Sequence, residues 1–240
     1  TTSLDVIYSS DTVLVQGEGV EVVNSATDTR AVVSGKILGV RSGRDGLTLC
    51  GRENEWYQTT LCSLALEKCI GDLEGRYILV RIHADGRVEL APDRFGRMDL
   101  YYQRVGEGYV VGSSLGLLPF KDGSVTYDQF GLAHSLYVYG FRPPKRHTLY
   151  DGVRRFGVGE YAVWAKGKLS FGEVAPHTVD ANQEYGKEDH ERYADIWLDA
   201  LEKRSSSSGN LVYLSSGWDS TSVLAGLVHL RGAENVKAVI

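Results

Sequence analysis

Seven consecutive residues near the C-terminal end carry groups suited to binding a phosphate: Ser215, Ser216, Gly217, Trp218, Asp219, Ser220 and Thr221. Small residues let backbone N–H groups approach an anion, and the hydroxyls of Ser215 and Ser220 add further donors. A helix expected to begin near Ser220 would turn the positive end of its dipole toward this loop. The segment therefore has the properties of a phosphate-binding loop.

The carboxylate of Asp219 gives this loop a second property. A carboxylate inside an anion-binding loop needs a cation to bridge it to the anion, so Asp219 is predicted to bind Mg²⁺ that holds a pyrophosphate. The alternative is an ordinary helix N-cap, in which Ser and Asp are common. The chemistry of the loop alone leaves both interpretations open.

The elements around the loop predict the first βαβ unit of a parallel sheet. A buried strand is expected at 211–214, a helix at 221–230 and a second strand from 236 onward. An amphipathic helix precedes them at 188–204, with one apolar face formed by Tyr193, Ile196, Trp197, Ala200 and Leu201. Because parallel sheets are normally covered on both faces, we expect the chain to be a fragment of a longer protein.

The residues before about 170 predict antiparallel strands instead. Strand, turn and strand patterns occur at 77–91, 100–112 and 161–171, the first with an Asp-Gly turn. Helical spacing of apolar residues interrupts them near 60–70 and 127–139. We therefore predict an α+β domain at 1–178, a linker at 179–187, and the start of an α/β domain with a parallel sheet at 188–240.

Composition excludes several classes of protein. The chain has 240 residues, of which 42% are hydrophobic and 24% charged, as in ordinary globular proteins. A net charge of −5 gives no long-range attraction for nucleic acid, so none is expected as a partner. No apolar run is long enough to span a membrane, and no secretory signal is visible, so we expect a cytoplasmic protein.

Cysteines and histidines offer no second site. Cys50, Cys62 and Cys69 form no CxxC pair and have no zinc-ligand spacing, so buried free thiols are expected. His83 and His134 lie on apolar periodic segments and are interpreted as satisfied core or interface histidines.

Two further pairs of residues are interpreted as structural. Asp93 and Arg94 are expected to form an ion pair at a strand end. Tyr101 and Tyr102 are expected at the core and edge of a sheet, because no basic patch accompanies them to make a base-stacking surface.

The loop resembles a known motif. Leu214–Ser220 is similar to the pyrophosphate loop S-G-G-x-D-S of the asparagine synthetase family, with Ser216 in place of a glycine. The resemblance implies an N-type ATP pyrophosphatase domain, with ATP and Mg²⁺ as cofactors. It also implies that Ser215, Ser216, Gly217 and Ser220 hold the β,γ-phosphates, that Asp219 binds Mg²⁺, and that the Leu214 main chain lies near the adenine or ribose.

The order of other segments extends this resemblance from about Asp72 to the C-terminal end. Residues 71–77 and 92–102 resemble the L-x-G-x-F and R-D-x-x-G-x-x-P-L-Y-Y segments of the family's glutaminase-like domain. Residues 112–118 stand where the family has S-E-x-K-A-L-L, and 148–153 with 159–161 resemble the strand pair that closes the domain. The resemblance implies an Ntn-hydrolase-like fold of stacked antiparallel sheets with helices.

The first seventy residues depart from the family pattern. The family's glutaminase uses an N-terminal cysteine, whereas this chain opens with Thr1 and its first cysteine, Cys50, is interior. Where the family has S-D-T-E, residues 53–57 read E-N-E-W-Y. An N-terminal threonine is a nucleophile in the same fold class, but the glutamine-binding segments are missing, so the domain is predicted to be a degenerate glutaminase.

The resemblance thus implies a ligase that activates a carboxylate as an acyl-adenylate, releases pyrophosphate and forms an amide with an amine. A missing glutaminase favours members that resemble β-lactam synthetase or lasso-peptide cyclases. Two alternatives stay open: a glutamine-hydrolysing asparagine synthetase whose nucleophile lies upstream of Thr1, and a non-catalytic binding or regulatory homologue. Expected partners are small-molecule or peptide carboxylate and amine substrates, with a homodimer as a further possibility; catalytic residues stay unidentified.

Overall fold

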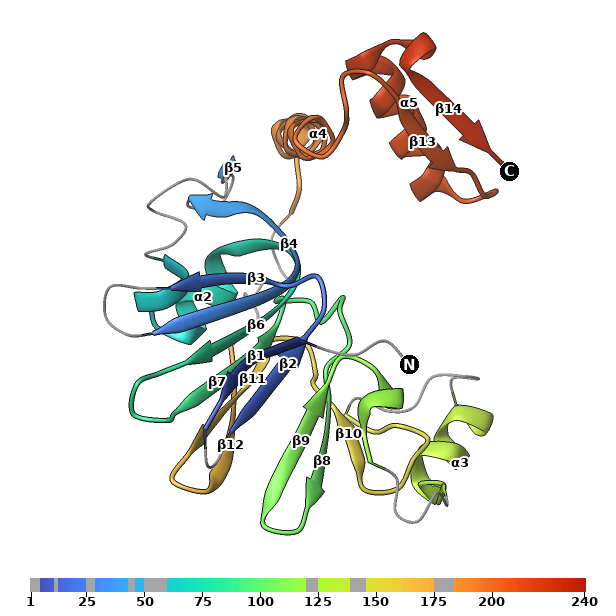
Figure 1. The fold of residues 1–240 in the computed structure, drawn as a ribbon. Coiled ribbons are helices and arrows are strands. Elements are labelled where there is room, and N and C mark those ends of the chain that lie inside the picture. Colours follow the sequence, from blue (N-terminus) through green and yellow to red (C-terminus); the bar gives the residue numbers. More distant parts are fainter. Residues whose placement is uncertain are drawn as a thin grey trace. The chain divides into compact units, whose positions relative to one another are not determined.

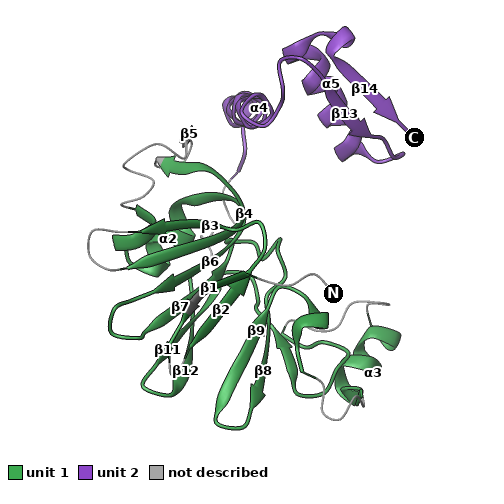
Figure 2. Ribbon diagram, viewed as in Figure 1, with its two compact units in different colours: residues 1–177 green, residues 178–240 purple. Residues whose placement is uncertain are grey.

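A computed structural model describes residues 5–10, 13–24, 29–42, 46–49, 60–119, 125–138, 146–174 and 184–240. The chain divides into two compact units, residues 1–177 and 178–240, shown in Figure 2. The predicted linker starts two residues after this division, and its residues 179–183 lie outside the described ranges. Each unit is described below by itself.

Unit 1 is built around a seven-stranded antiparallel sheet (Figure 1). Its strands follow the order β12-β11-β7-β6-β4-β3, with β5 paired to β4. Their bounds are β3 (Glu21–Asn24), β4 (Arg30–Ser42), β5 (Gly46–Leu49), β6 (Leu73–Ile82), β7 (Val88–Pro92), β11 (Glu160–Ala165) and β12 (Lys168–Glu173).

Local turn chemistry creates the hairpins of this sheet. Gly86 has a φ of 80° in the turn between β6 and β7, a value that an L side chain rarely adopts. Lys166 and Gly167, with φ of 51° and 75°, form the two-residue turn between β11 and β12. Two positive values match the twist of the flanking strands. The predicted hairpins at 77–91 and 161–171 are therefore confirmed.

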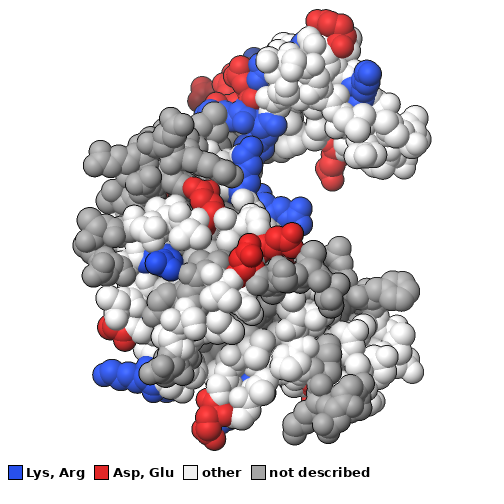
Figure 3. Space-filling view, in the orientation of Figure 1, with Lys and Arg blue, Asp and Glu red and all other residues white. Residues whose placement is uncertain are grey.

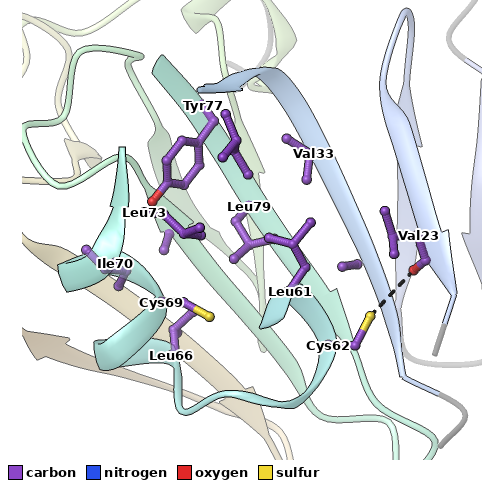
Figure 4. Packing of buried hydrophobic residues seen from close by; sticks show 13 residues of the cluster. Val23, Val33, Leu61, Cys62, Leu66, Cys69, Ile70, Leu73, Tyr77 and Leu79 are labelled. Carbon is purple, nitrogen blue, oxygen red and sulfur yellow. Dashed lines mark hydrogen bonds between the residues drawn. The ribbon is translucent and has the colours of Figure 1, made fainter. Parts of the chain in front are cut away.

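One face of the sheet packs against helix α2 (Leu66–Asp72). Figure 4 shows this core, in which α2 and the helical residues 60–63 cover side chains that alternate along the strands. It includes Val33, Leu61, Leu66, Cys69, Ile70, Tyr77 and Leu79. The helix expected near 60–70 is interrupted at residues 64 and 65, so it forms two short pieces.

The other face packs against a second, three-stranded sheet of order β10-β8-β9. Its strands are β8 (Tyr101–Val105), β9 (Gly108–Gly112) and β10 (Val153–Arg155). Tyr102 of β8 contacts Phe156 and Phe171 with ring centroids 5.4 and 4.8 Å apart. A separate hairpin of β1 (Asp5–Ser9) and β2 (Leu14–Gly17) contributes Val15 to the same side. Unit 1 is therefore a mixed α+β structure with stacked antiparallel sheets.

The segment expected to close the domain pairs differently from the prediction. Residues 148–153 lead into β10, which pairs with β8, whereas β11 pairs with β7 and β12. The two segments therefore belong to different sheets and do not form a pair with each other.

Helix α3 (Gln129–Tyr137) lies beside β10 in Figure 1, and it confirms the helix expected near 127–139. The Asp128 side chain caps it by accepting a hydrogen bond from the Gly131 N–H at 2.9 Å. A Cβ at Gly131 would lie 2.5 Å from the Thr148 carbonyl oxygen, so only glycine permits this close approach. A short 3₁₀ helix, η1 (Leu115–Leu117), follows β9.

Unit 2 is a βαβ unit preceded by a helix. It contains α4 (Lys187–Glu202), β13 (Asn210–Tyr213), α5 (Trp218–Arg231), η3 (Ala233–Asn235) and β14 (Val236–Val239). The strands β13 and β14 pair in parallel, as expected. The prediction of a buried strand is wrong for two of its residues: Val212 is buried, but Leu211 and Tyr213 are 55% and 75% exposed, because α5 covers one face only.

The apolar face of α4 is only partly buried. A Cβ added to Gly226 of α5 would lie 2.4 Å from Leu201 Cδ1 and 3.6 Å from Trp197 Nε1, so α4 and α5 pack closely there. Tyr193, expected on the same face, is 68% exposed. Among the described helices, none has both the length and the hydropathy needed to cross a membrane.

Candidate functional site

The predicted phosphate loop connects β13 to α5. The Leu214 N–H donates to the Val239 carbonyl at 2.7 Å, which extends the pairing of β13 with β14 by one residue. Gly217 then caps α5 with extended backbone angles, and α5 begins at Trp218. The loop thus leaves the carboxyl end of a parallel strand and enters a helix N-terminus, where ligands bind in open parallel sheets.

The hydroxyl groups of Ser215 and Ser220 form hydrogen bonds within the loop. The Ser220 hydroxyl accepts the Ser215 N–H at 3.1 Å, and the Ser215 and Ser220 hydroxyls are 3.1 Å apart. Ser215 Oγ also accepts the Gly217 N–H at 3.2 Å. Two backbone donors and two hydroxyls are therefore used within the loop, so Ser215 and Ser220 shape it rather than offering all their donors to a ligand.

The remaining residues of the loop face solvent. Ser216, Trp218 and Asp219 are exposed, and Trp218 reaches 87% exposure. Thr221 turns its hydroxyl back to the Gly217 carbonyl, to which it donates at 3.0 Å. The loop therefore brings all the predicted residues together, with Asp219 in the first turn of α5.

Asp219 fits one part of a magnesium site. Mg²⁺ in nucleotide sites takes one or two carboxylates, with phosphates and waters as the other ligands. Among the described residues, no three His, Cys, Asp or Glu side chains gather into a group that could hold a metal ion by themselves. A single exposed carboxylate beside free helix N–H groups is compatible with a cation that arrives with its phosphates.

A second aspartate turn lies in unit 1 and has the opposite character. Asp93, 1% exposed, accepts hydrogen bonds from the N–H groups of Phe95, Arg97 and Met98 at 3.1, 3.0 and 3.3 Å. Its ion-pair partner is Arg97, with Nε 3.0 Å from Oδ1, so the predicted pair with Arg94 is wrong. The turn at Gly96, with φ of 60°, brings Arg97 back over the carboxylate.

Burial by itself would lower the pKa of the Arg97 guanidinium, but the Asp93 and Glu74 carboxylates outweigh it and raise that pKa. Arg97 lies 3.3 Å from Glu74, which extends the pair into a small network. This turn stabilises the fold and has no acceptor left for a ligand.

Two further charged clusters were missed by the sequence analysis. Arg81 and Glu89, directly opposite each other on β6 and β7, are both buried and in contact. His83 Nε2 lies 3.3 Å from the same carboxylate but is buried without a hydrogen-bond partner among the described residues, whereas Nδ1 lies within hydrogen-bond distance of a neighbouring hydroxyl, so the interpretation of His83 as a satisfied histidine holds for one ring nitrogen only. Charged residues at core-facing strand positions were the signal available for this cluster. His134, on α3, is half-buried, with its ring 6.3 Å from that of Phe130.

The second cluster connects the start of α3 to β10 and to the residues before it. Asp128 lies 3.0 Å from His147 and 2.9 Å from Arg154. Burial opposes its charge, but donation from the Gly131 N–H, His147 and Arg154 lowers the pKa of Asp128 to about 2. Asp128 lies 19 residues before His147 and 26 residues before Arg154 in the sequence, so no short-range pattern predicts these contacts.

The described cysteines lie in the core of unit 1. Cys62 and Cys69 are free and buried, as predicted. Burial raises the pKa of both thiols, that of Cys69 to about 11, so neither forms the thiolate readily. Cys50, Thr1 and residues 53–57 lie outside the described residues.

Comparison with known families adds one finding to this geometry. Residues 60–174 match the glutamine amidotransferase domain family. The match covers α2, both stacked sheets from β6 onward, and α3, and it is consistent with the N-terminal domain of asparagine synthetase-like proteins. It ends before unit 2, and no curated protein matches the chain. The ATP pyrophosphatase domain therefore stays a prediction.

Proposed function

We propose that the protein is an ATP-dependent carbon–nitrogen ligase in which an amidotransferase-type domain precedes a nucleotide-binding unit. The amidotransferase match at 60–174 supports the first part. The observation that carries the second part is the loop between parallel β13 and α5, which exposes Asp219 at a helix N-terminus. The carboxylate would attack the α-phosphate of ATP and release pyrophosphate to form an acyl-adenylate, and an amine would then attack the acyl carbon and release AMP to form the amide.

In this proposal the loop residues divide into two roles. Ser215 and Ser220 hold the loop in shape through their mutual hydrogen bonds. The N–H groups at the start of α5 face the β,γ-phosphates, where the helix dipole favours negative charge. Asp219 binds Mg²⁺, which would neutralise the phosphates. The Leu214 main chain lies at the strand end, near the adenine or ribose.

The source of nitrogen has two candidate answers. The amidotransferase match favours glutamine, from which such domains release ammonia. The missing glutamine-binding segments, with E-N-E-W-Y at 53–57 where the family has S-D-T-E, favour an amine supplied by the substrate. We propose the second, with a degenerate glutaminase in unit 1.

Two measurements on the intact protein test this function. The first is ATP–pyrophosphate exchange, scanned over amino acids and small carboxylic acids, where at least one carboxylate should stimulate exchange. MgATP binding without exchange would favour the non-catalytic alternative, and absence of MgATP binding would overturn the proposal. The second is glutamate release from glutamine, which we expect to be absent. Release that Thr1→Ala abolishes would establish glutamine as the nitrogen source.

A further inference from the structure

Two like charges face each other across the main sheet of unit 1. Lys36 on β4 and Arg76 on β6 are direct partners in the strand register, and both side chains are exposed. Neither has an ion pair within the described part of the chain. Like charges in directly opposed positions destabilise a sheet, so this pair lowers the stability of unit 1 unless a negatively charged partner offsets the repulsion.

The positive charge continues into the Asp93 turn. Arg97 donates a hydrogen bond to the carbonyl of Gly75, the residue next to Arg76. Arg97 and Arg94 both lie over the ring of Phe95, at 5.4 and 5.6 Å from its centroid. Phe95 is 48% exposed. Arg97 therefore lies beside the backbone next to Arg76, whose register partner is Lys36, so these four cations and the Phe95 ring are neighbours in unit 1.

The carboxylates within this surface are already engaged. Asp93 is buried and accepts the backbone and side-chain hydrogen bonds described above. Glu74 is buried and lies between Arg41 and Arg97, at 3.7 and 3.3 Å. Among the described residues, these five cations therefore outnumber the two carboxylates, which are both buried, so the charge that this set of residues presents to solvent is positive.

We propose that Lys36, Arg76, Arg94, Arg97 and Phe95 form a docking surface for an acidic peptide segment. Exposed ion pairs contribute little individually, so a partner gains affinity only by engaging several cations at once. A flexible chain of carboxylates can do so, whereas a single small anion cannot. The proposal is independent of the ligase activity proposed above.

Nucleic acid, the other polyanion, fits these observations less well. The whole chain carries a net charge of −5, which opposes the approach of a phosphate backbone. Figure 3 shows acidic as well as basic side chains on the face that it draws. Nucleic-acid-binding proteins usually present a continuous basic stripe instead.

The test measures binding of fluorescein-labelled hexaglutamate to the full chain by fluorescence anisotropy at low salt. The Lys36→Gln/Arg76→Gln double variant should bind about tenfold more weakly, equivalent to about 1.4 kcal/mol. The matched control, Lys168→Gln/Lys237→Gln, removes two exposed lysines elsewhere and should bind as the parent does. Binding by the parent should weaken as salt is added.

Stability provides the second readout. Because Lys36 and Arg76 repel each other, Lys36→Gln should raise the thermal unfolding midpoint while it weakens binding, a combination that a merely structural role would not give. The proposal is overturned if hexaglutamate does not bind, if the double variant and the control lose affinity equally, or if labelled hexathymidylate binds more tightly than hexaglutamate.

Discussion

The turn at Asp93 and the loop at Asp219 both place an aspartate beside backbone N–H groups, but they surround it differently. Asp93 is buried, and three N–H groups and the Arg97 side chain fill its acceptor positions. Asp219 is exposed, and its side chain has no hydrogen bond or ion pair among the described residues. A saturated carboxylate stabilises a fold, whereas an open one is available to a ligand.

The largest expected effect is on stability, at Asp93. Asp93→Asn would remove the negative charge that pairs with Arg97 and leave at least one backbone N–H without an acceptor, so the free energy of unfolding should fall by about 3 kcal/mol. Urea denaturation measures this. The matched control is Asp99→Asn, because Asp99 is half-exposed and its ion pair with Arg155 is long, at 3.7 Å. This substitution should lower the free energy of unfolding by less than about 1 kcal/mol. Equal losses would remove the distinction between the two turns.

At Asp219 the effect should fall on activity instead. Asp219→Asn should lower carboxylate-dependent ATP–pyrophosphate exchange by about a hundredfold, or about 3 kcal/mol, because a charge that holds Mg²⁺ is lost. The unfolding free energy should not change. Asp195→Asn, which removes the same charge from the exposed face of α4, serves as the control and should keep full exchange. Ser216→Gly should also be tolerated.

Asp128 is another carboxylate with saturated acceptors, and its contribution to stability should depend on pH. Its pKa in the folded protein is about 2, below the usual value near 4, so the stability it contributes is complete above pH 4 and is lost as pH falls toward 2. The loss should amount to about 2 kcal/mol. Unfolding free energies measured between pH 5 and 2 should decline less steeply for Asp128→Asn, and parallel curves would contradict the assignment.

The smallest effect concerns Tyr77, a buried residue whose polar group is not satisfied. Its side chain is fully buried in the α2 core, and its hydroxyl has no hydrogen-bond partner among the described residues. Tyr77 stands where the resembled family has phenylalanine. Tyr77→Phe should therefore raise the unfolding free energy by about 1 kcal/mol, because an uncompensated hydroxyl leaves the core. If Tyr77→Phe instead lowers the unfolding free energy by more than about 1 kcal/mol, the hydroxyl has a hydrogen-bond partner such as a buried water.

The sequence predicted those parts of the fold that neighbouring residues decide. The hairpins at Gly86 and at Lys166-Gly167 follow from turn residues, and the parallel pairing of β13 with β14 follows from the strand, helix and strand order. The partner of Asp93 could not be predicted in this way. Arg94 is adjacent in sequence, but the turn at Gly96 decides that Arg97 reaches the carboxylate.

The candidate site was predicted in its residues but not in their contacts. A motif identifies Ser215 and Ser220 as hydroxyl donors, but only the folded loop shows that they bond to each other. Clusters built across strands, such as Arg81 with Glu89, depend on the register of β6 and β7. The register is a property of the whole sheet, and short-range patterns do not specify it.

The central claim is that the loop at Asp219, and not the turn at Asp93, binds the nucleotide. Hydrogen exchange of the full chain with and without saturating MgATP tests it most directly, because one experiment measures the backbone N–H groups of both segments. We predict slower exchange of the backbone N–H groups at 216–221 when MgATP is present, and no change at 93–98. If MgATP binds but leaves 216–221 unchanged, or if it protects 93–98 instead, the assignment of the nucleotide site to the loop between β13 and α5 is wrong.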